Sequence, residues 1–141
     1  MSAEKSKTIV QRYFSQVATE GNLAAVDELF SQDIAFHDPA APEDLQGTEA
    51  VKQFFSALHV AFPDLYFTVD ELFAVEDKVA ARWTVRGTHK GELMGIAPTK
   101  NQVTVSGVDI FHIMAGKIHE VWVSLDTLKF MQQLGVVPLP G

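Results

Sequence analysis

After Pro63 the chain consists of four β-rich runs, and this arrangement limits the possible fold more than any other feature of the sequence. The runs cover residues 65–75, 78–89, 102–113 and 117–125, with tight connections at 76–77 and 115–116. Tight turns join neighbouring antiparallel strands, so the runs predict a meander. Residues 90–101 are rich in turn formers, and we expect them to form an irregular excursion between two paired strands.

The residues before Pro63 show helical periodicity. Residues 3–19 repeat apolar side chains at spacings of three and four, and so do residues 23–30 after Asn22, a candidate N-cap. A short strand at 34–38 and a loop at 39–47 come before a third helix, which begins near Thr48 and ends at Pro63. Residues 126–134 return to helical spacing, and Asp126 is a candidate N-cap.

This order of elements predicts an α+β fold in which the N-terminal helices cover the concave face of an antiparallel sheet. The chain has 141 residues and 47% of them are hydrophobic, which is enough for one complete core. We therefore expect a single domain over residues 1–141.

Composition excludes several classes of function. The net charge is −7 and the eleven Lys and Arg residues are scattered, so we expect neither a nucleic-acid nor a membrane partner. The chain contains no cysteine, no hydrophobic leader and no apolar run long enough to span a bilayer, which favours a cytoplasmic location. No metal-ligand spacing or nucleotide-binding loop is present, so we expect no metal and no cofactor.

The last hairpin determines which side chains share a face. A two-residue turn at 115–116 would place Ala115 at positive φ, which a residue with a Cβ disfavours. We therefore expect a three-residue loop with residue 113 opposite 117, which puts Asp109 opposite Val121. On this register His112 and Glu120 share the outer face as a structural pair.

Both faces of this hairpin are apolar. The inner face carries Val103, Val105, Asp109, Phe111, Val121 and Val123, and the outer face carries Val108, Ile110, His112, Ile118 and Trp122. A sheet with one buried face would alternate apolar with polar residues, so we expect the outer face to form a homodimer interface.

Four segments together carry a family resemblance: HDP at 37–39, GTHKGELMGIAPTK from residue 87, DIFHIMAGKIHEVW from residue 109 and DTLKFMQQLG from residue 126. The chain resembles the SnoaL-like polyketide cyclase, or ester cyclase, family of the nuclear-transport-factor-2-like superfamily, which also contains ketosteroid isomerases. The resemblance implies a cystatin-like fold, with a cone-shaped curved sheet around an apolar pocket.

The ketosteroid isomerases suggest catalytic residues. They carry a Tyr and two Asp residues at positions comparable to Tyr13, Asp38 and Asp109. By this resemblance Asp38 is the general base, and Tyr13 with a protonated Asp109 donates hydrogen bonds to an enolate oxygen. The residues themselves leave simpler roles open, because Tyr13 can be a core aromatic and Asp38 can cap a turn.

Asp109 is the most informative of the three. Its strand neighbours are apolar, so its carboxyl group requires a partner, and we expect Tyr13 or Arg82. We also expect the pocket to be lined by residues that contact substrate: Arg82, Phe55, Phe111, Val123 and Trp122.

A second catalytic pair is suggested by polyketide cyclases of this family, which use a His and an Asp fourteen residues apart. Asp109 and Val123 have this spacing but lack both groups, whereas His112 and Asp126 have both groups and lie on the outer face. His112 and Asp126 are therefore the alternative catalytic pair.

Together these features predict cofactor-free acid/base chemistry, of the cyclase or isomerase type, on a small hydrophobic carbonyl compound. The alternative is a non-catalytic module that binds an apolar small molecule in the same pocket. A third reading is a structural dimer with a filled pocket.

Overall fold

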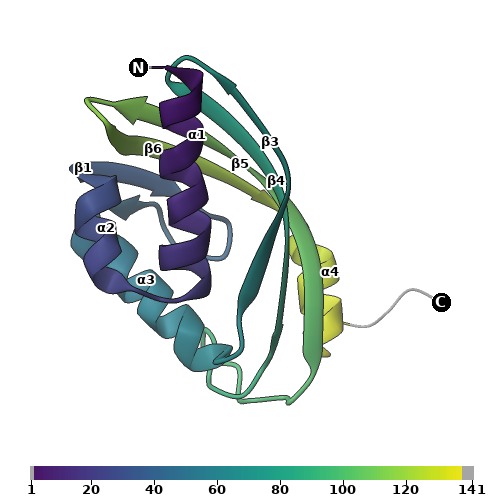
Figure 1. Ribbon diagram of the computed structural model, residues 1–141. Coiled ribbons are helices and arrows are strands. Elements are labelled where there is room, and N and C mark those ends of the chain that lie inside the picture. The colour runs from purple at the N-terminus through teal and green to yellow at the C-terminus, as the bar shows by residue number, and fades with distance from the viewer. Residues whose placement is uncertain (1, 138–141) are drawn as a thin grey trace.

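The computed structural model describes residues 2–137 (Figure 1). The chain starts with α1 (Ala3–Arg12), which runs directly into a π-helix (Tyr13–Thr19), and α2 (Leu23–Leu29) follows. Next come β1 (Phe30–His37), β2 (Leu45–Gln46) and α3 (Gly47–Ala61). The chain then forms β3 (Tyr66–Val75), β4 (Lys78–Thr88), β5 (Gln102–Met114), β6 (Lys117–Leu125) and α4 (Thr127–Leu134).

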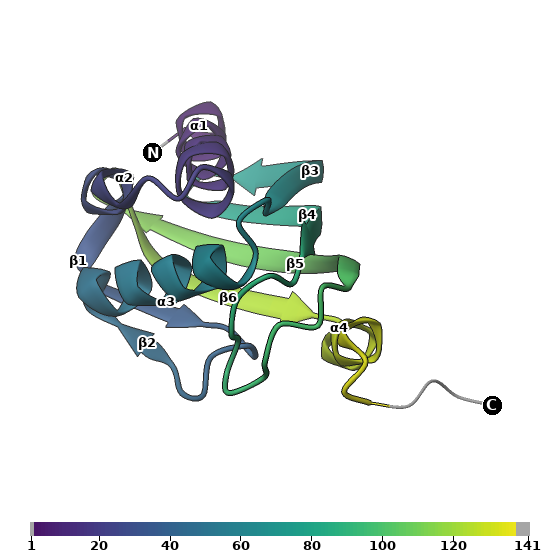
Figure 2. The ribbon, with the colours of Figure 1, turned by 90° about the horizontal axis from the view of Figure 1, so that it is seen from below.

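The strands form one six-stranded sheet in the order β2-β1-β6-β5-β4-β3. All neighbours are antiparallel except β1 and β6, which are parallel. The sheet is curved and open, and α1 and α3 lie inside its curve, as Figures 1 and 2 show. The α+β class and the helix-covered curved sheet expected from the sequence are confirmed.

The helices begin where the sequence predicts. The side chain of Asn22 accepts a hydrogen bond from the Ala24 amide, and that of Asp126 accepts one from the Lys129 amide, so both residues are N-caps. The π-helix was not predicted, because an apolar stripe does not distinguish an α-helix from a π-helix. Within residues 2–137 no helix is both long and apolar enough to cross a membrane.

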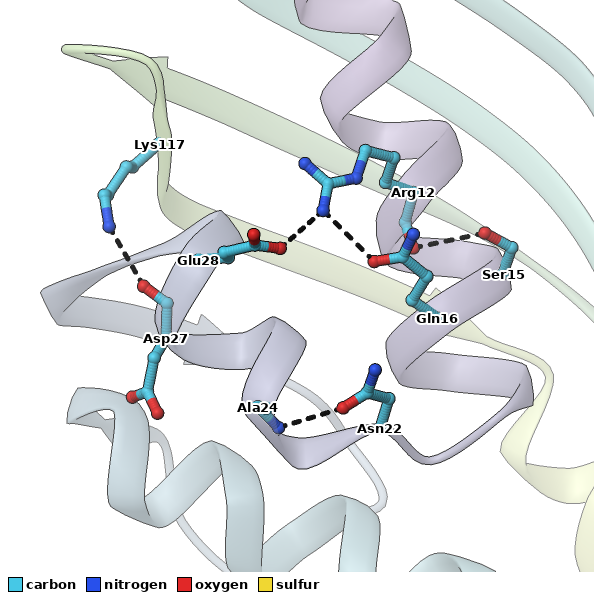
Figure 3. Close-up of polar contacts among 8 residues, drawn as sticks. All are labelled: Arg12, Ser15, Gln16, Asn22, Ala24, Asp27, Glu28 and Lys117. Atoms are coloured by element: carbon cyan, nitrogen blue, oxygen red, sulfur yellow. Dashed lines mark hydrogen bonds and ion pairs between the residues drawn. The ribbon is translucent and has the colours of Figure 1, made fainter.

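Polar contacts join the last residue of α1 to α2, and α2 to β6 (Figure 3). The Arg12 guanidinium donates to the Gln16 side chain and to the Glu28 carboxylate, which lies on α2. Lys117, at the start of β6, donates from Nζ to the backbone carbonyl of Asp27 at 2.9 Å. These contacts fix the end of the helix that carries Tyr13 relative to the sheet.

The first strand differs from the prediction. β1 begins at Phe30, although the periodicity assigned Phe30 to the preceding helix and started the strand at residue 34. Phe30 has an extended backbone and pairs with Ile118 of β6, a contact between residues far apart in the sequence. Residues 45–46, expected in a loop, form the short strand β2 against β1.

The hairpin turn was also predicted wrongly. Ala115 has φ of 51° and Gly116 has φ of 79°, so both lie in the left-handed region and Met114 pairs with Lys117 across a two-residue turn. The register then shifts after His112, which leaves His119 as a bulge, and Asp109 lies opposite Val123 rather than Val121. The twist of the strands favours this turn enough to offset the cost of placing Ala115 at positive φ.

The convex face carries an apolar row that crosses four strands. Successive cross-strand pairs join Phe73 of β3, Ala80 of β4, Ile110 of β5 and Trp122 of β6. Phe73, Ile110 and Trp122 are 63%, 38% and 37% exposed, so this row is open to solvent in the isolated chain. We refer to these four residues as the convex row.

Ala115→Asn is expected to raise the free energy of unfolding by up to about 1 kcal/mol, because Asn adopts the left-handed conformation at lower cost than Ala. Urea unfolding at neutral pH measures the change. Gly116→Ala is the matched control and should destabilise the protein, since Gly116 also lies at positive φ. A lower stability of Ala115→Asn would contradict the two-residue turn with Ala115 at positive φ.

Candidate active site

A cavity of about 390 Å³ lies inside the curve of the sheet, bounded by the π-helix, α3, α4 and the loops after β1 and β4. Most of its lining is apolar. The polar lining residues are Tyr13, Asp38, Gln53, Trp83, Glu92 and Asp109. Among the described residues that line it there is no Lys, Arg or His, so the cavity holds carboxyl groups and no cationic side chain.

Asp109 lies in the middle of β5 and is only 2% exposed. The indole Nε1 of Trp83 donates to its Oδ1 at 2.9 Å. Burial raises the pKa of Asp109 to about 8; the bond from Trp83 opposes this rise and the charge of Asp38 adds to it. Asp109 is therefore mainly a neutral carboxylic acid at pH 7.

Tyr13 is the first residue of the π-helix and is buried. Its ring contacts those of Phe55 and Phe111, with centroids 6.0 and 5.4 Å away. Burial, and then the charges of Asp109 and Asp38, raise the pKa of the phenol well above its usual value, so it stays protonated.

Two polar atoms of the lining residues have no hydrogen-bond partner among the described residues. Within residues 2–137 neither the Tyr13 hydroxyl nor Oδ2 of Asp109 takes part in a hydrogen bond, and neither belongs to the buried, unpartnered polar atoms, of which His89 Nε2 is the one found. Each atom therefore keeps some accessible surface, and both residues line the cavity. A neutral Asp109 and a neutral Tyr13 can each donate a hydrogen bond to a ligand there.

Asp38 follows directly after β1 and lies nearer the surface than Asp109. Its Oδ1 accepts a hydrogen bond from the Ala40 amide at 2.8 Å, which stabilises the ionised form. Burial has the larger effect and raises the pKa of Asp38 above its usual value. A carboxylate with a raised pKa is a stronger base than an ordinary one.

The neighbouring residue His37 is held on the other face of the sheet. Its Nδ1 lies 2.8 Å from Asp44 and its Nε2 lies 2.7 Å from Glu120, and its ring stacks on Trp122. The bond to Glu120, followed by that to Asp44, raises the pKa of His37. His112 and Glu120, predicted as a structural pair, do lie opposite each other on β5 and β6. The Glu120 carboxylate nevertheless binds His37, and the His112 ring packs against Trp122.

Gly107 makes room for the Trp83 indole. The two residues are direct partners across β4 and β5, and Asp109 is the next residue of β5 on the same face. A Cβ at Gly107 would lie 2.4 Å from Cζ2 of Trp83 and 2.7 Å from the backbone oxygen of Ser124. The indole thus lies over a position without a side chain and reaches Asp109.

The structure brings together five of the residues named from the sequence. Tyr13, Asp38, Asp109, Phe55 and Val123 all line the cavity.

Three other residues expected in the lining are not there. Arg82 lies on the convex face with its side chain 50% exposed, paired with Glu71 and Asp70, because its neighbour Trp83 takes the inward position on β4. Trp122 belongs to the convex row. Phe111 is fully buried in the core beneath the cavity, against Tyr13 and Phe14.

The alternative pair is not assembled. His112 lies on the convex face beside Trp122, and the Asp126 carboxylate caps α4; neither residue lines the cavity. Between residues 2 and 137 no group of three or more His, Cys, Asp or Glu side chains is placed to hold a metal ion.

Sequence reasoning missed Trp83, the actual partner of Asp109. Two signals were available. Trp83 alternates with Arg82 along β4, and a glycine in the middle of the long β5 strand indicates that another group approaches the backbone closely.

A curved sheet with helices inside it and carboxyl groups in an apolar cavity defines a cone-shaped α+β protein of the nuclear-transport-factor-2-like class. The family model of SnoaL-like polyketide cyclases matches residues 8–134, and the chain belongs to this family.

Solved structures agree with this assignment. A candidate polyketide cyclase from Acidithiobacillus ferrooxidans is 31% identical, with a TM-score of 0.82 over 96% of this chain and 98% of that one. AclR, a candidate hydroxylase from Streptomyces galilaeus, is 27% identical, with a TM-score of 0.85 over 99% and 87%. IdmH, a candidate polyketide cyclase from Streptomyces antibioticus, is 26% identical, with a TM-score of 0.79 over 93% and 99%.

Asp109→Asn is expected to be more stable than the wild type at pH 8, by a margin that shrinks toward pH 4. The folded protein keeps the Asp109 proton up to about pH 8, whereas the unfolded chain loses it near pH ~4. The unfolded state therefore binds fewer protons in this window, so the wild-type free energy of unfolding falls as pH rises, by up to about 1.4 kcal/mol per pH unit.

Urea unfolding of both proteins from pH 4 to 8 measures this margin. The difference between them isolates Asp109, because His37 and Asp38 are present in both. A margin that does not change with pH would contradict a neutral Asp109 in the folded protein.

Proposed function

We propose that this protein catalyses cofactor-free proton transfer at a carbon next to the carbonyl group of a small, neutral, hydrophobic compound, in a reaction of the cyclase or isomerase type. The observation that carries the proposal is the meeting of one base and two donors in a single cavity. Asp38 is the base, and the hydroxyl of Tyr13 and Oδ2 of a neutral Asp109 are the donors.

The Asp38 carboxylate removes a proton from the α-carbon, and the electron pair of the C–H bond moves toward the carbonyl oxygen. The enolate oxygen accepts hydrogen bonds from Tyr13 and Asp109, which are preorganised in a cavity with few other polar groups. In an isomerisation, Asp38 returns the proton to another carbon. In a ring closure, the α-carbon attacks a second carbonyl carbon and the resulting alkoxide takes the proton from Asp38.

The environments of the two carboxyl groups support this division of roles. Both lie in one cavity, so the charge on one disfavours the charge on the other. Asp38 is nearer the surface and accepts a backbone hydrogen bond, so it ionises first, while Asp109 is the more deeply buried and stays neutral. Two titratable groups with different environments are the usual arrangement for acid/base catalysis.

The charge of the lining supports a neutral ligand. The cavity contains Asp38, Glu92 and Asp109, with no cationic side chain among the described lining residues. A carboxylate or phosphate in the ligand would lose its hydration without gaining a counter-ion.

Asp38→Asn is expected to slow exchange of the α-protons of 2-tetralone for deuterium by about 10²- to 10⁴-fold, the usual contribution of a general base. Proton NMR in D₂O measures the exchange. The wild-type exchange rate should rise with pH as Asp38 ionises and fall above pH 8, where Asp109 loses its proton. The variant Asp109→Asn should exchange more slowly than the wild type, and its rate should not fall above pH 8.

Asp33→Asn is the matched control, since Asp33 lies on β1, the strand that Asp38 follows, with its side chain 81% exposed. It should exchange 2-tetralone at the wild-type rate. A wild-type protein that binds 2-tetralone but does not accelerate exchange would overturn the catalytic proposal and favour the non-catalytic binding module.

We also propose that the protein is a homodimer that buries the convex row. Phe73, Ile110 and Trp122 form a continuous apolar line across neighbouring strands, and soluble monomers seldom leave such a line in water. A two-fold interface would stack the row of one subunit on the same row of its partner.

Ile110→Glu is expected to convert the dimer to a monomer, because it places a charge in the centre of the buried row. Light scattering at micromolar concentration measures the mass. Leu128→Glu is the control, since Leu128 is 60% exposed on α4, away from the row, and this variant should remain dimeric. A monomeric wild type would contradict the proposal.

A further inference from the structure

We propose that Trp83 is a positioning residue that fixes which oxygen of Asp109 carries the acid proton, so that the O–H bond is presented to the cavity. This inference rests on the proposed function, because it concerns the donor that would bind the enolate oxygen. Its geometry, however, can be tested without any ligand.

The direction of the Trp83 hydrogen bond carries the argument. An indole N–H can only donate, so Oδ1 of Asp109 must accept. In a carboxylic acid the carbonyl oxygen is the better acceptor, so the proton resides on Oδ2. Oδ2 is also the oxygen without a partner within residues 2–137; it is not fully buried, and Asp109 lines the cavity.

The surrounding strands hold the indole in this position. Trp83 faces Gly107 directly and Asp109 lies one same-face position further along β5, so the ring must cross the strand diagonally to reach the carboxyl group. The missing side chain at Gly107 permits this, since Cζ2 and Cη2 of the ring occupy the space of a Cβ. Phe67 packs edge-on against the indole, with ring centroids 5.2 Å apart.

Without this bond the two oxygens of Asp109 would be nearly equivalent. The proton would then be shared between Oδ1 and Oδ2, and the carboxyl group could rotate. Trp83 touches Asp109 and needs no contact with the substrate, so its role would be to position the donor rather than to take part in the reaction.

The first measurement follows the indole N–H groups by NMR. The chain has two tryptophans, so the variants Trp83→Phe and Trp122→Phe assign both signals. The Trp83 N–H should shift with a midpoint near pH 8 as Asp109 ionises and its hydrogen bond becomes charge-assisted. Asp109→Asn should abolish the shift.

The second measurement follows the Asp109 carboxyl group by carbon-13 NMR. Trp83→Phe removes the donor that stabilises the ionised form and keeps an aromatic ring, so the Asp109 midpoint should rise by about one pH unit. Trp122→Phe, the same substitution on the convex face, should leave the midpoint unchanged. Gly107→Ala keeps the indole but displaces it, and it should raise the midpoint as Trp83→Phe does.

A third measurement uses 2-naphthol, a neutral fused-ring phenol whose anion resembles an enolate. Trp83→Phe should weaken its binding about three- to tenfold, the effect of one misaligned hydrogen bond. An unchanged Asp109 midpoint in both Trp83→Phe and Gly107→Ala would overturn the positioning role. If the wild type does not bind 2-naphthol but the Asp109 and Trp83 titrations are as expected, the proposed function is overturned. The positioning of Asp109 by Trp83 would still be supported.

Discussion

A carboxyl group in the middle of a central strand sets the conditions for the rest of this structure. An ionised Asp109 without a counter-ion would cost several kcal/mol in such a place. The fold meets this constraint by keeping the group neutral and giving it one uncharged donor, Trp83, rather than a cation. Gly107, the preceding residue of β5 on the same face, leaves the space that the indole needs. The cavity therefore gains an acid proton without gaining a charge.

The alternation of side chains along the strands was enough to place Asp109 on the inner face. Beyond the bulge at His119 the hairpin register was wrong by two residues, yet the assignment of faces survived there, because side chains on a strand repeat with a period of two. The bulge reverses the faces before it, so Ile118, assigned to the outer face, is buried in the core opposite Ile113. Asp109 and Val123 were correctly predicted to lie on the inner face, where they line the cavity, and Val108, Ile110 and Trp122 were correctly predicted to lie on the outer face. The capping residues Asn22 and Asp126 were also readable, since caps depend on local hydrogen bonds.

Features that depend on distant pairings could not be read from the sequence. The parallel contact of β1 with β6 joins segments about ninety residues apart and moves the start of β1 to Phe30. It also brings His37 to Glu120, so the Glu120 carboxylate bonds to His37 although Glu120 lies opposite His112 on β5. The expectation of Arg82 as a partner of Asp109, offered beside Tyr13, failed for a related reason. Charge complementarity favoured Arg82, while the register between β4 and β5 decided which of Arg82 and its neighbour Trp83 points inward.

The contact between Gly107 and Trp83 has a consequence for how sequences of this family can diverge. Gly107 bears no chemical group, yet any side chain there displaces the indole or the backbone of β6. A lineage that keeps tryptophan at position 83 must therefore keep glycine at position 107, and one that replaces the tryptophan with a smaller residue is free to accept alanine or serine there. The residues at positions 83 and 107 should therefore covary. Relatives with tryptophan and glycine at these positions would have an acid donor positioned as in this protein, and relatives with other residues there would lack it.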